Sequence, residues 1–113
     1  MSDRRAQVIT LSASSAKTGS GDSGPVSVER YAEALVFIDV TAAGGTNPTL
    51  SFDVECGPED GALGFIHTQP AQITGTGKTL VKLANIGPWL RLRWTLGGTN
   101  PSFTFSAVLA LKT

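Results

Sequence analysis

The sequence predicts an all-β fold: a single antiparallel β-sandwich, or jelly-roll-like domain, of eight or nine short strands. Several segments alternate apolar and polar residues with a period of two, which is the pattern of strands with one buried face. Thirteen glycines and six prolines in 113 residues separate these segments at the spacing expected of tight turns. Residues 29–33 are the one segment that suits a helical turn, and they are too few to shape the fold.

The alternation is strongest in the last quarter of the chain. Residues 90–96 and 103–111 each place large apolar side chains on one face, and Gly-Gly-Thr-Asn-Pro at 97–101 lies between them. Two alternating segments around a turn-rich stretch are typical of a β-hairpin, so we expect them to pair with each other as the floor of the core. The expected inward residues are Leu90, Leu92, Trp94, Leu96, Phe103, Phe105, Ala107, Leu109 and Leu111.

Six further strands are expected, at residues 8–13, 26–28, 34–41, 49–56, 63–67 and 79–83. Residues 34–41 form a continuous apolar run, which is typical of a central strand covered on both faces. Residues 49–56 alternate instead. Their expected inward residues are Leu50, Phe52, Val54 and Cys56, and their expected solvent-facing residues are Ser51, Asp53 and Glu55. An inward position predicts that the Cys56 thiol is buried and inert.

A five-residue motif occurs twice. Gly-Gly-Thr-Asn-Pro stands at residues 44–48 and again at 97–101, each time between an apolar strand and an alternating one. One interpretation is two hairpins with the same turn chemistry, in which glycine supplies positive φ angles and proline begins the return strand. The other is that the two loops lie at one end of the sandwich and form a shared contact surface.

Length and charge limit the organisation and the partners. A chain of 113 residues is too short for two cores, so we expect a flexible arm at residues 1–6 and one sandwich domain at 7–113. Nine basic and nine acidic residues cancel, which argues against nucleic acid or an anionic membrane as the main partner. No apolar run suits a membrane helix or a signal peptide, so we expect a protein made in a cytoplasm.

Groups that carry out chemistry are sparse, and we expect neither an enzyme nor a cofactor or metal site. Residues 75–79 resemble the end of a phosphate-binding loop, but Gln72 stands where that motif needs glycine, and a strand rather than a helix is expected next. His67 is the sole histidine, and no Gly-x-Ser-x-Gly motif accompanies it. Glu59 and Asp60 form an acidic turn that is either simply solvated or able to hold a calcium ion.

Charged residues alternate on two strands. Asp53 and Glu55 share one expected solvent face, and Arg91 and Arg93 share another. If the strands are neighbours, these residues form cross-strand pairs of small energy; if not, they are available to a partner subunit.

Apolar and aromatic residues outside the expected core indicate contact surfaces. Val108 and Ala110 lie opposite the core-facing residues of their strand, which leaves that strand end apolar on both sides and predicts cover by another strand or another subunit. Trp94 alternates with leucines and is expected in the core, whereas Trp89 faces the other way. An exposed Trp89 close to Tyr31 would suit the stacking of a sugar ring.

Three stretches have a familiar pattern: Leu-Ser-Ala-Ser-Ser-Ala-Lys-Thr-Gly at residues 11–19, the apolar run 34–42 with Asn-Pro-Thr-Leu at 47–50, and Gly-Pro-Trp-Leu-Arg-Leu-Arg-Trp at 87–94 followed by Pro-Ser-Phe-Thr-Phe-Ser at 101–106. In these stretches the sequence resembles small virion structural proteins of tailed bacteriophages. The resemblance covers most of the chain from residue 11 onward and consists of strand and turn patterns.

The resemblance implies a non-enzymatic capsid decoration or cement protein that bridges major capsid subunits on the virion exterior, as a homotrimer or other homo-oligomer. The alternatives are a tail or head-tail component, and a carbohydrate-binding β-sandwich module. The candidate partner-contact residues are Arg4, Arg5, Gly44, Gly45, Thr46, Asn47, Trp89, Arg91, Arg93, Gly97, Gly98, Thr99, Asn100, Val108 and Ala110.

Overall fold

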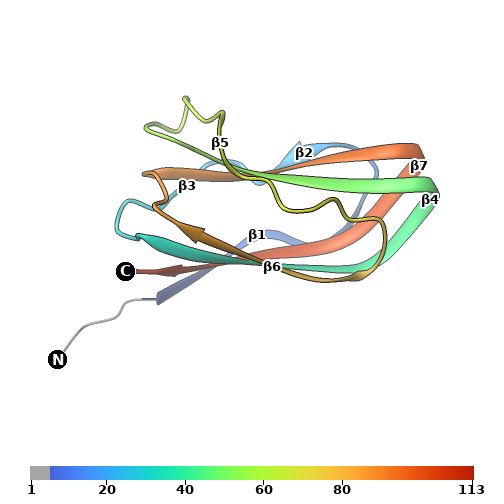
Figure 1. Ribbon diagram of the computed structural model, residues 1–113, viewed down its shortest axis with the longest axis horizontal. Helices are drawn as coiled ribbons and strands as arrows, with labels where there is room; N and C mark the ends of the chain where they lie inside the picture. The colour runs from blue at the N-terminus through green and yellow to red at the C-terminus, as the bar shows by residue number, and fades with distance from the viewer. Residues whose placement is uncertain (1–5) are drawn as a thin grey trace.

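The computed structural model describes residues 6–113 and shows in them two layers of antiparallel strands without a helix (Figure 1). The expected all-β antiparallel sandwich is confirmed. The first strand, β1 (Ala6–Lys17), begins at the last residue of the expected arm, and the rest of that arm lies outside the described residues. Over residues 6–113, no helical segment has the length and apolar character needed to cross a membrane.

Two long strands form the centre of the fold. β4 (Glu33–Gly57) has 25 residues and β7 (Trp89–Lys112) has 24, and the two pair antiparallel from one end to the other. Figure 1 shows that both strands bend at the same end of the molecule and fold back. Each strand therefore contributes one half to each layer of the sandwich.

The other strands extend the folded pair on both sides. In the first layer, β1 pairs with the second half of β7, and β6 (Gly77–Ala84) pairs with the first half of β4. In the second layer, β2 (Gly21–Asp22) and β3 (Val26–Ser27) pair with the first half of β7, and β5 (Phe65–Thr68) pairs with the second half of β4. With β2 and β3 taken as one interrupted strand, each layer has four strand segments, which together give the eight of a jelly roll.

The hairpin predicted at the C-terminus is wrong in its pairing. Residues 90–96 and 103–111 are the two halves of β7, lie in different layers, and each pair with β4 instead of with one another. Residues 42–48, expected to be a loop, also belong to β4. A period of two shows which residues face the core, but it does not identify the partner strand. The expected short strands are thus fewer and longer in the structure.

The bend consists of the two repeated motifs, residues 44–48 and 97–101, which lie side by side; we call it the corner. Thr46 pairs with Thr99, and the ladder shifts register on both sides of this pair, as at β-bulges that bend a strand. In both motifs the second glycine and the asparagine have positive φ angles. These residues are Gly45 (104°), Asn47 (49°), Gly98 (103°) and Asn100 (48°). The two copies therefore have the same backbone conformation and are related by a local twofold axis.

The two backbones approach so closely at the corner that only glycine fits. A Cβ atom on Gly45 would lie 2.5 Å from the carbonyl oxygen of Asn100, and a Cβ atom on Gly98 would lie 2.5 Å from that of Asn47. The interpretation of the repeats as two hairpin turns is therefore wrong, and their expected location together at one end of the sandwich is confirmed.

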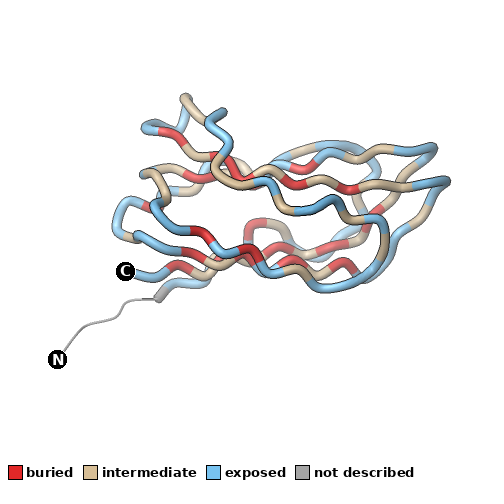
Figure 2. Tube along the Cα trace, in the orientation of Figure 1, coloured by how far each residue is buried: buried red, intermediate tan, exposed pale blue. Residues whose placement is uncertain are grey.

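The core fills the space between the layers (Figure 2). The inward pattern expected of the two halves of β7 is confirmed, with Leu96 half-buried at its margin. Phe105 lies among other aromatic side chains, with its ring centroid 5.2 Å from that of Phe52 and 5.3 Å from that of Trp94, both edge-to-face. Cys56 is half-buried rather than buried, because it lies near the end of β4, where the core thins out.

Polar side chains close the two open edges between the layers. On one side, the Lys17 ammonium lies 4.4 Å from the ring centroid of Phe105, and desolvation lowers its pKa from the ordinary value of 10.5. On the other side, His67 of β5 contacts the carbonyl oxygen of Ala84 on β6 through Nε2 at 2.6 Å, and Thr68 Oγ1 through Nδ1 at 2.6 Å. Because a carbonyl oxygen only accepts, Nε2 carries the proton. His67 thus links the edge strands of the two layers.

Replacing Gly45 with alanine is expected to destabilise the fold by about 1–3 kcal/mol, because alanine is strained at this φ angle and its Cβ would collide with the Asn100 carbonyl. Gly44→Ala is the matched control, since its Cβ would meet its nearest neighbour, Ser102 Cβ, only at 3.9 Å. Urea denaturation of both variants measures the difference. Equal stability of Gly45→Ala and Gly44→Ala would contradict the close approach at the corner.

Candidate functional site

The outer surface of the first layer is apolar across its four strands. Two neighbouring rows of residues point away from the core there. They are Val8, Ala110, Leu35 and Lys82 in one row, and Thr10, Val108, Phe37 and Leu80 in the next. The six apolar members, Val8, Leu35, Phe37, Leu80, Val108 and Ala110, are called the apolar face below.

The apolar face is open to solvent. Val8 is 69 % exposed, Phe37 47 % and Leu80 50 %, and the other three residues are half-buried. Large apolar side chains at adjacent exposed positions mark sites for other proteins. Val108 and Ala110, which the sequence indicated as needing cover, lie in the middle of this surface.

The sequence predicts that residues 34–41 are covered on both faces. In the described part of the chain only one face is covered. Ala34, Val36 and Ile38 are buried in the core, but Leu35 and Phe37 point outward. The apolar run is still the pattern of a doubly covered strand. Among residues 6–113, however, nothing covers the outer face of this run.

The same two strands are polar on the outside of the second layer, which shows that the apolar face is not a general property of this sandwich. The outward residues of β4 and β7 there are Ser51, Asp53, Glu55, Arg91, Arg93 and Thr95, with the half-buried Trp89 at the start of β7. One layer thus presents a surface suited to water and the other a surface suited to a protein partner.

Charged residues border two shallow grooves on the first layer. One groove of about 320 Å³ is lined by residues that include Phe37 and Leu80 together with Asp39 and Lys78. The other groove, of about 270 Å³, is lined by residues that include Leu35 and Ala84 together with three charged ones, Glu33, Lys82 and Lys112. On β6, Lys78 and Lys82 stand on either side of Leu80, and Asp39 of β4 lies opposite Lys78.

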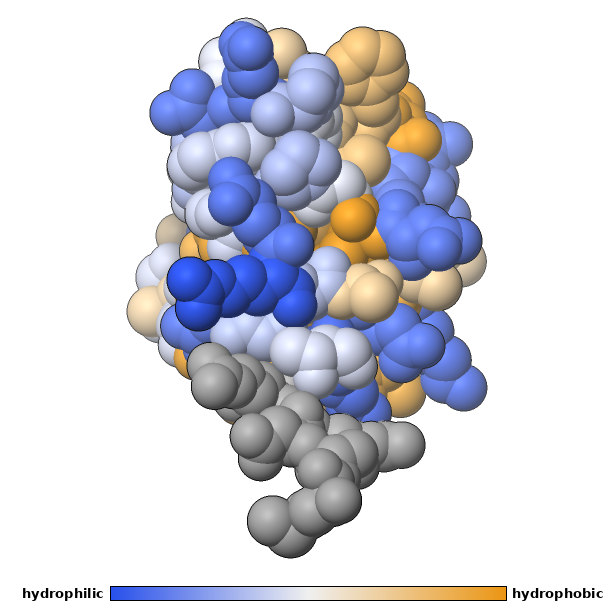
Figure 3. Space-filling model, turned by 90° about the vertical axis from the view of Figure 1, so that its left-hand side faces the viewer, coloured by the Kyte–Doolittle hydropathy of each residue, from blue (hydrophilic) through white to orange (hydrophobic). Residues whose placement is uncertain are grey.

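A second apolar surface lies at the start of β5 and was not identified from the sequence. Phe65 is 65 % exposed and Ile66 is 54 % exposed. Figure 3 shows apolar atoms near the top of this end of the molecule, beside hydrophilic ones. The signal was present, because two consecutive large apolar residues in a short strand cannot both face one core.

An acidic turn precedes β5. The amide of Ala62 donates a hydrogen bond to the carbonyl oxygen of Glu59 at 3.1 Å, and a Cβ atom on Gly57 would collide with the carbonyl oxygen of Ala62. The turn carrying Glu59 and Asp60 is therefore held close to the end of β4. Glu59, Asp60, Phe65 and Ile66 together are called the β5 end below.

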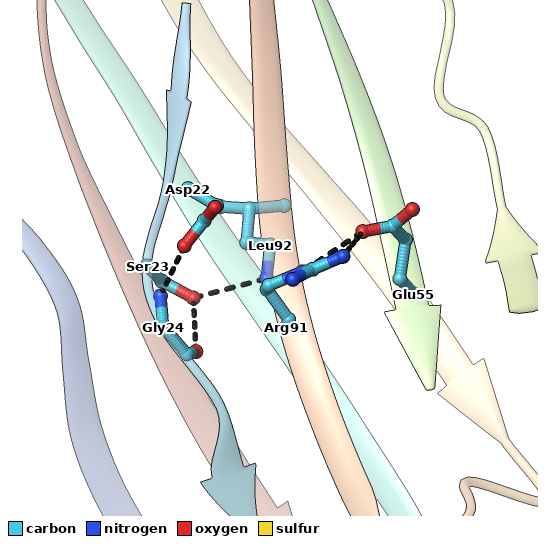
Figure 4. Close-up of polar contacts among 6 residues, drawn as sticks. All are labelled: Asp22, Ser23, Gly24, Glu55, Arg91 and Leu92. Atoms are coloured by element: carbon cyan, nitrogen blue, oxygen red, sulfur yellow. Dashed lines mark hydrogen bonds and ion pairs between the residues drawn. The ribbon is translucent and has the colours of Figure 1, made fainter. Parts of the chain in front are cut away.

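The charge pairs expected between neighbouring strands form in part. Glu55 lies opposite Arg91, and Arg91 Nε and Nη2 donate to Glu55 Oε1 at 2.9 and 2.6 Å (Figure 4). The prediction that Glu55 faces solvent is wrong, since it is only 4 % exposed. Its alternating position puts it outside the core, but β5 pairs beside it and Arg91 covers it. The guanidinium is thus used within the chain.

The connection between β2 and β3 is fastened to β7 beside this pair. The amide of Leu92 donates to Ser23 Oγ at 3.0 Å, and Ser23 N donates to the Leu92 carbonyl at 2.8 Å (Figure 4). Asp22 Oδ1 accepts from the Gly24 amide at 2.8 Å. The serine- and glycine-rich composition of residues 14–25 predicts a flexible loop, but residues 14–17 belong to β1 and these bonds hold the following residues along the second layer.

The other candidate contact residues are dispersed. Gly45, Thr46, Asn47, Gly98, Thr99 and Asn100 are exposed together at the corner, with Gly44 and Gly97 half-buried beneath them. Arg93 is exposed, opposite Asp53 in the ladder. Arg4 and Arg5 lie outside the described residues.

The two aromatic residues of the possible sugar site are both half-buried. Tyr31 packs against the core, and its hydroxyl donates to Gln7 Oε1 at 2.8 Å. Trp89 lies at the start of β7, opposite Gly57 and Ser27.

Groups suited to catalysis or metal binding do not gather in the described part of the chain. No cluster of three or more histidine, cysteine, aspartate or glutamate residues suits a metal ion among residues 6–113. Residues 75–79 lead directly into β6, so the helix N-terminus that holds a phosphate in the nucleotide motif is replaced by a strand. The surfaces that stand out are the apolar face, the β5 end and the corner.

No protein-family model matches the sequence, and a search of curated proteins finds no relative. The fold, by contrast, matches many solved structures. A structure of infectious bursal disease virus, Gx strain, aligns with a TM-score of 0.67 and 13 % identity over 98 % of this chain and 32 % of that chain. Several further matches are viral or subviral particles of the same virus.

Two other matches carry the names of a prophage-derived and an exported protein. The SPBc2 prophage-derived protein YomS aligns with a TM-score of 0.63 and 10 % identity over 100 % of this chain and 97 % of that one. The PBSX exported protein XepA aligns with a TM-score of 0.65 and 8 % identity over 93 % of this chain and 36 % of that one. This chain therefore spans about a third of the virus chain and of XepA, and nearly all of YomS. At these identities the likeness is one of fold.

Replacing Arg91 with methionine is expected to destabilise the protein by about 2–3 kcal/mol, because it leaves the buried Glu55 carboxylate unpaired. The double variant Glu55→Met/Arg91→Met removes both charges and is expected to lie closer to the native protein in stability than the single variant does. Denaturant unfolding at pH 7 compares them. A single variant as stable as the double one would show that the pair contributes little.

Proposed function

We propose that this chain is a non-enzymatic structural protein of a bacteriophage virion, and specifically a capsid decoration or cement protein. The observation that carries the proposal is the apolar face: a jelly roll exposes a continuous apolar sheet surface that residues 6–113 leave open. A surface of this kind is expected of a subunit that functions in an assembly.

The structural likenesses support the same role. The matched folds come from virus particles and from a prophage-derived protein. The resemblance of residues 11–19, 34–50 and 87–106 to small virion proteins of tailed phages points to the same kind of assembly. The partners are then the major capsid protein and further copies of this chain, on the exterior of a virion whose parts are made in the host cytoplasm.

The corner is the proposed contact with the capsid. It places two copies of Gly-Gly-Thr-Asn-Pro at one end of the molecule, so their exposed threonine and asparagine side chains form one small polar surface. Positive φ angles and close backbone packing fix the shape of this surface. Because the corner is already fixed in shape, it loses little conformational entropy on binding, so a small number of contacts can give useful affinity.

A cement role follows from repeated modest contacts. Each bridging copy buries surface on more than one capsid subunit, and linked copies make every further contact intramolecular, which raises the overall affinity without new chemistry. Rupture of the shell then requires many such contacts to break together.

Thr46→Arg/Thr99→Arg is expected to reduce binding to phage heads at least about tenfold, because two bulky cations are placed at the centre of the proposed contact. The measurement is co-sedimentation of purified protein with heads that lack it. Ser27→Arg/Ala32→Arg, which adds the same charge at exposed positions at the opposite end of the long strands, is the control and is expected to bind as the native protein does.

Native protein that fails to sediment with heads would overturn the decoration role. If it sediments with tails instead, the tail or head-tail alternative replaces that role. Undiminished head binding by the corner variant would keep the decoration role and reject the corner as its contact.

A further inference from the structure

We infer that the apolar face of one copy receives the β5 end of a second copy, so that the chain assembles head to tail. This inference deepens the proposed structural role and rests on it, since it names the partner that covers the apolar face. Its test does not involve the virion, so the two proposals succeed or fail separately.

The two surfaces are the large open apolar areas of the same molecule. The apolar face is broad and carries grooves of about 320 and 270 Å³ on its β4–β6 side. The β5 end instead offers an aromatic side chain, Phe65, that is 65 % exposed at the margin of an edge strand. An aromatic side chain in a groove is the usual form of an energetically dominant contact.

Their charges are complementary. On β6, Lys78 and Lys82 stand on either side of Leu80, whereas Glu59 and Asp60 precede Phe65. Placing Phe65 beside Leu80 brings the acidic turn of one copy toward the lysines of the other. Opposite charges at the rim of an apolar contact speed association and fix its register.

The symmetric alternatives bring like charges together. Two β5 ends in contact would juxtapose two acidic turns. Two apolar faces in contact would bring the lysines of both β6 strands, with Lys112, into one interface that holds only Glu33 and Asp39 from each copy against them. Like-charge juxtaposition across an interface costs binding energy, so the unlike pairing is favoured over both.

The arrangement of the two surfaces makes the contact heterologous. The apolar face lies on the outside of the first layer, and β5 lies at the edge of the second layer. A copy that uses one surface keeps the other free for a further neighbour. Contacts of this type repeat until a ring closes or a filament forms.

The size of the apolar face sets the expected strength. Four strands about 4.8 Å apart and two rows that together span about four residues of about 3.3 Å each give roughly 250 Å² per copy. A standard stable interface uses about 800 Å² per partner. A single contact is therefore weak, and we expect assembly to depend on protein concentration and to become firm only when a ring closes.

The test uses two variants, Leu80→Asp on the apolar face and Phe65→Asp on the β5 end, with size-exclusion chromatography and light scattering. Native protein is expected to assemble as its concentration rises, and each variant alone is expected to stay monomeric. An equimolar mixture of the two is expected to form a one-to-one dimer, because Leu80→Asp retains an intact β5 end and Phe65→Asp retains an intact apolar face. Both residues are exposed, so thermal unfolding close to that of the native protein confirms that the variants fold.

Thr95→Asp, an exposed position on the polar outside of the second layer, is the matched control and is expected to assemble as the native protein does. The inference is overturned if native protein stays monomeric at millimolar concentration, if Phe65→Asp still assembles, or if the mixture forms no dimer. Assembly of Phe65→Asp but not of Leu80→Asp would identify a face-to-face dimer instead. Head-to-tail assembly by protein that ignores phage heads would retain this contact and reject the decoration role.

Discussion

The close approach of two backbones at the corner determines the rest of the structure. Without the bend, β4 and β7 would form a straight two-stranded ribbon about 80 Å long, with apolar residues on one side and no second layer to cover them. Bending at Gly45 and Gly98 turns each strand back, so that the apolar side of one half packs on the apolar side of the other. The core, with Phe52 and Phe105 in edge-to-face contact between the layers, forms only because the ribbon is folded.

Most of the core was predictable and the strand pairing was not, for a physical reason. Alternation reports the side of the sheet on which a residue lies, so nearly all inward residues of β7 were identified correctly. Pairing depends on which strand is the neighbour in the sheet, and alternation carries no information about that. The motif Gly-Gly-Thr-Asn-Pro is compatible with a sharp bend as well as with a tight turn. The duplication of the motif held the missing information, since two strands that bend together need matching bends. Glu55 illustrates the same limit: its position away from the core was predicted, whereas its cover by β5 and Arg91 depends on neighbours.

The candidate surfaces could be predicted from the sequence only in part. Val108 and Ala110 indicated an uncovered apolar strand, but the size of that surface emerged only when the ladder placed Phe37 and Leu80 in the same row. Residues 34–41 have the sequence of a strand with two covers, and residues 6–113 supply one. The predicted cover on both faces is therefore wrong for the described part of the chain. Phe65 and Ile66 were missed although two consecutive large apolar residues in a short strand cannot both face one core.

The two layers have different outer surfaces although the same two strands build both. Outside the second layer the strands carry serine, threonine, carboxylates and arginines, with Glu55 and Arg91 in an ion pair. Outside the first layer they carry leucine, phenylalanine, valine and alanine at the centre, with Glu33, Asp39, Ser106 and Lys112 around them. Because β4 and β7 are continuous, this change of character occurs at the corner, within single strands. Burial of the first layer by a partner would therefore leave the second layer and the corner accessible. The outside of the first layer, the outside of the second layer and the corner are therefore three separate surfaces of different chemistry, although two continuous strands build all of them.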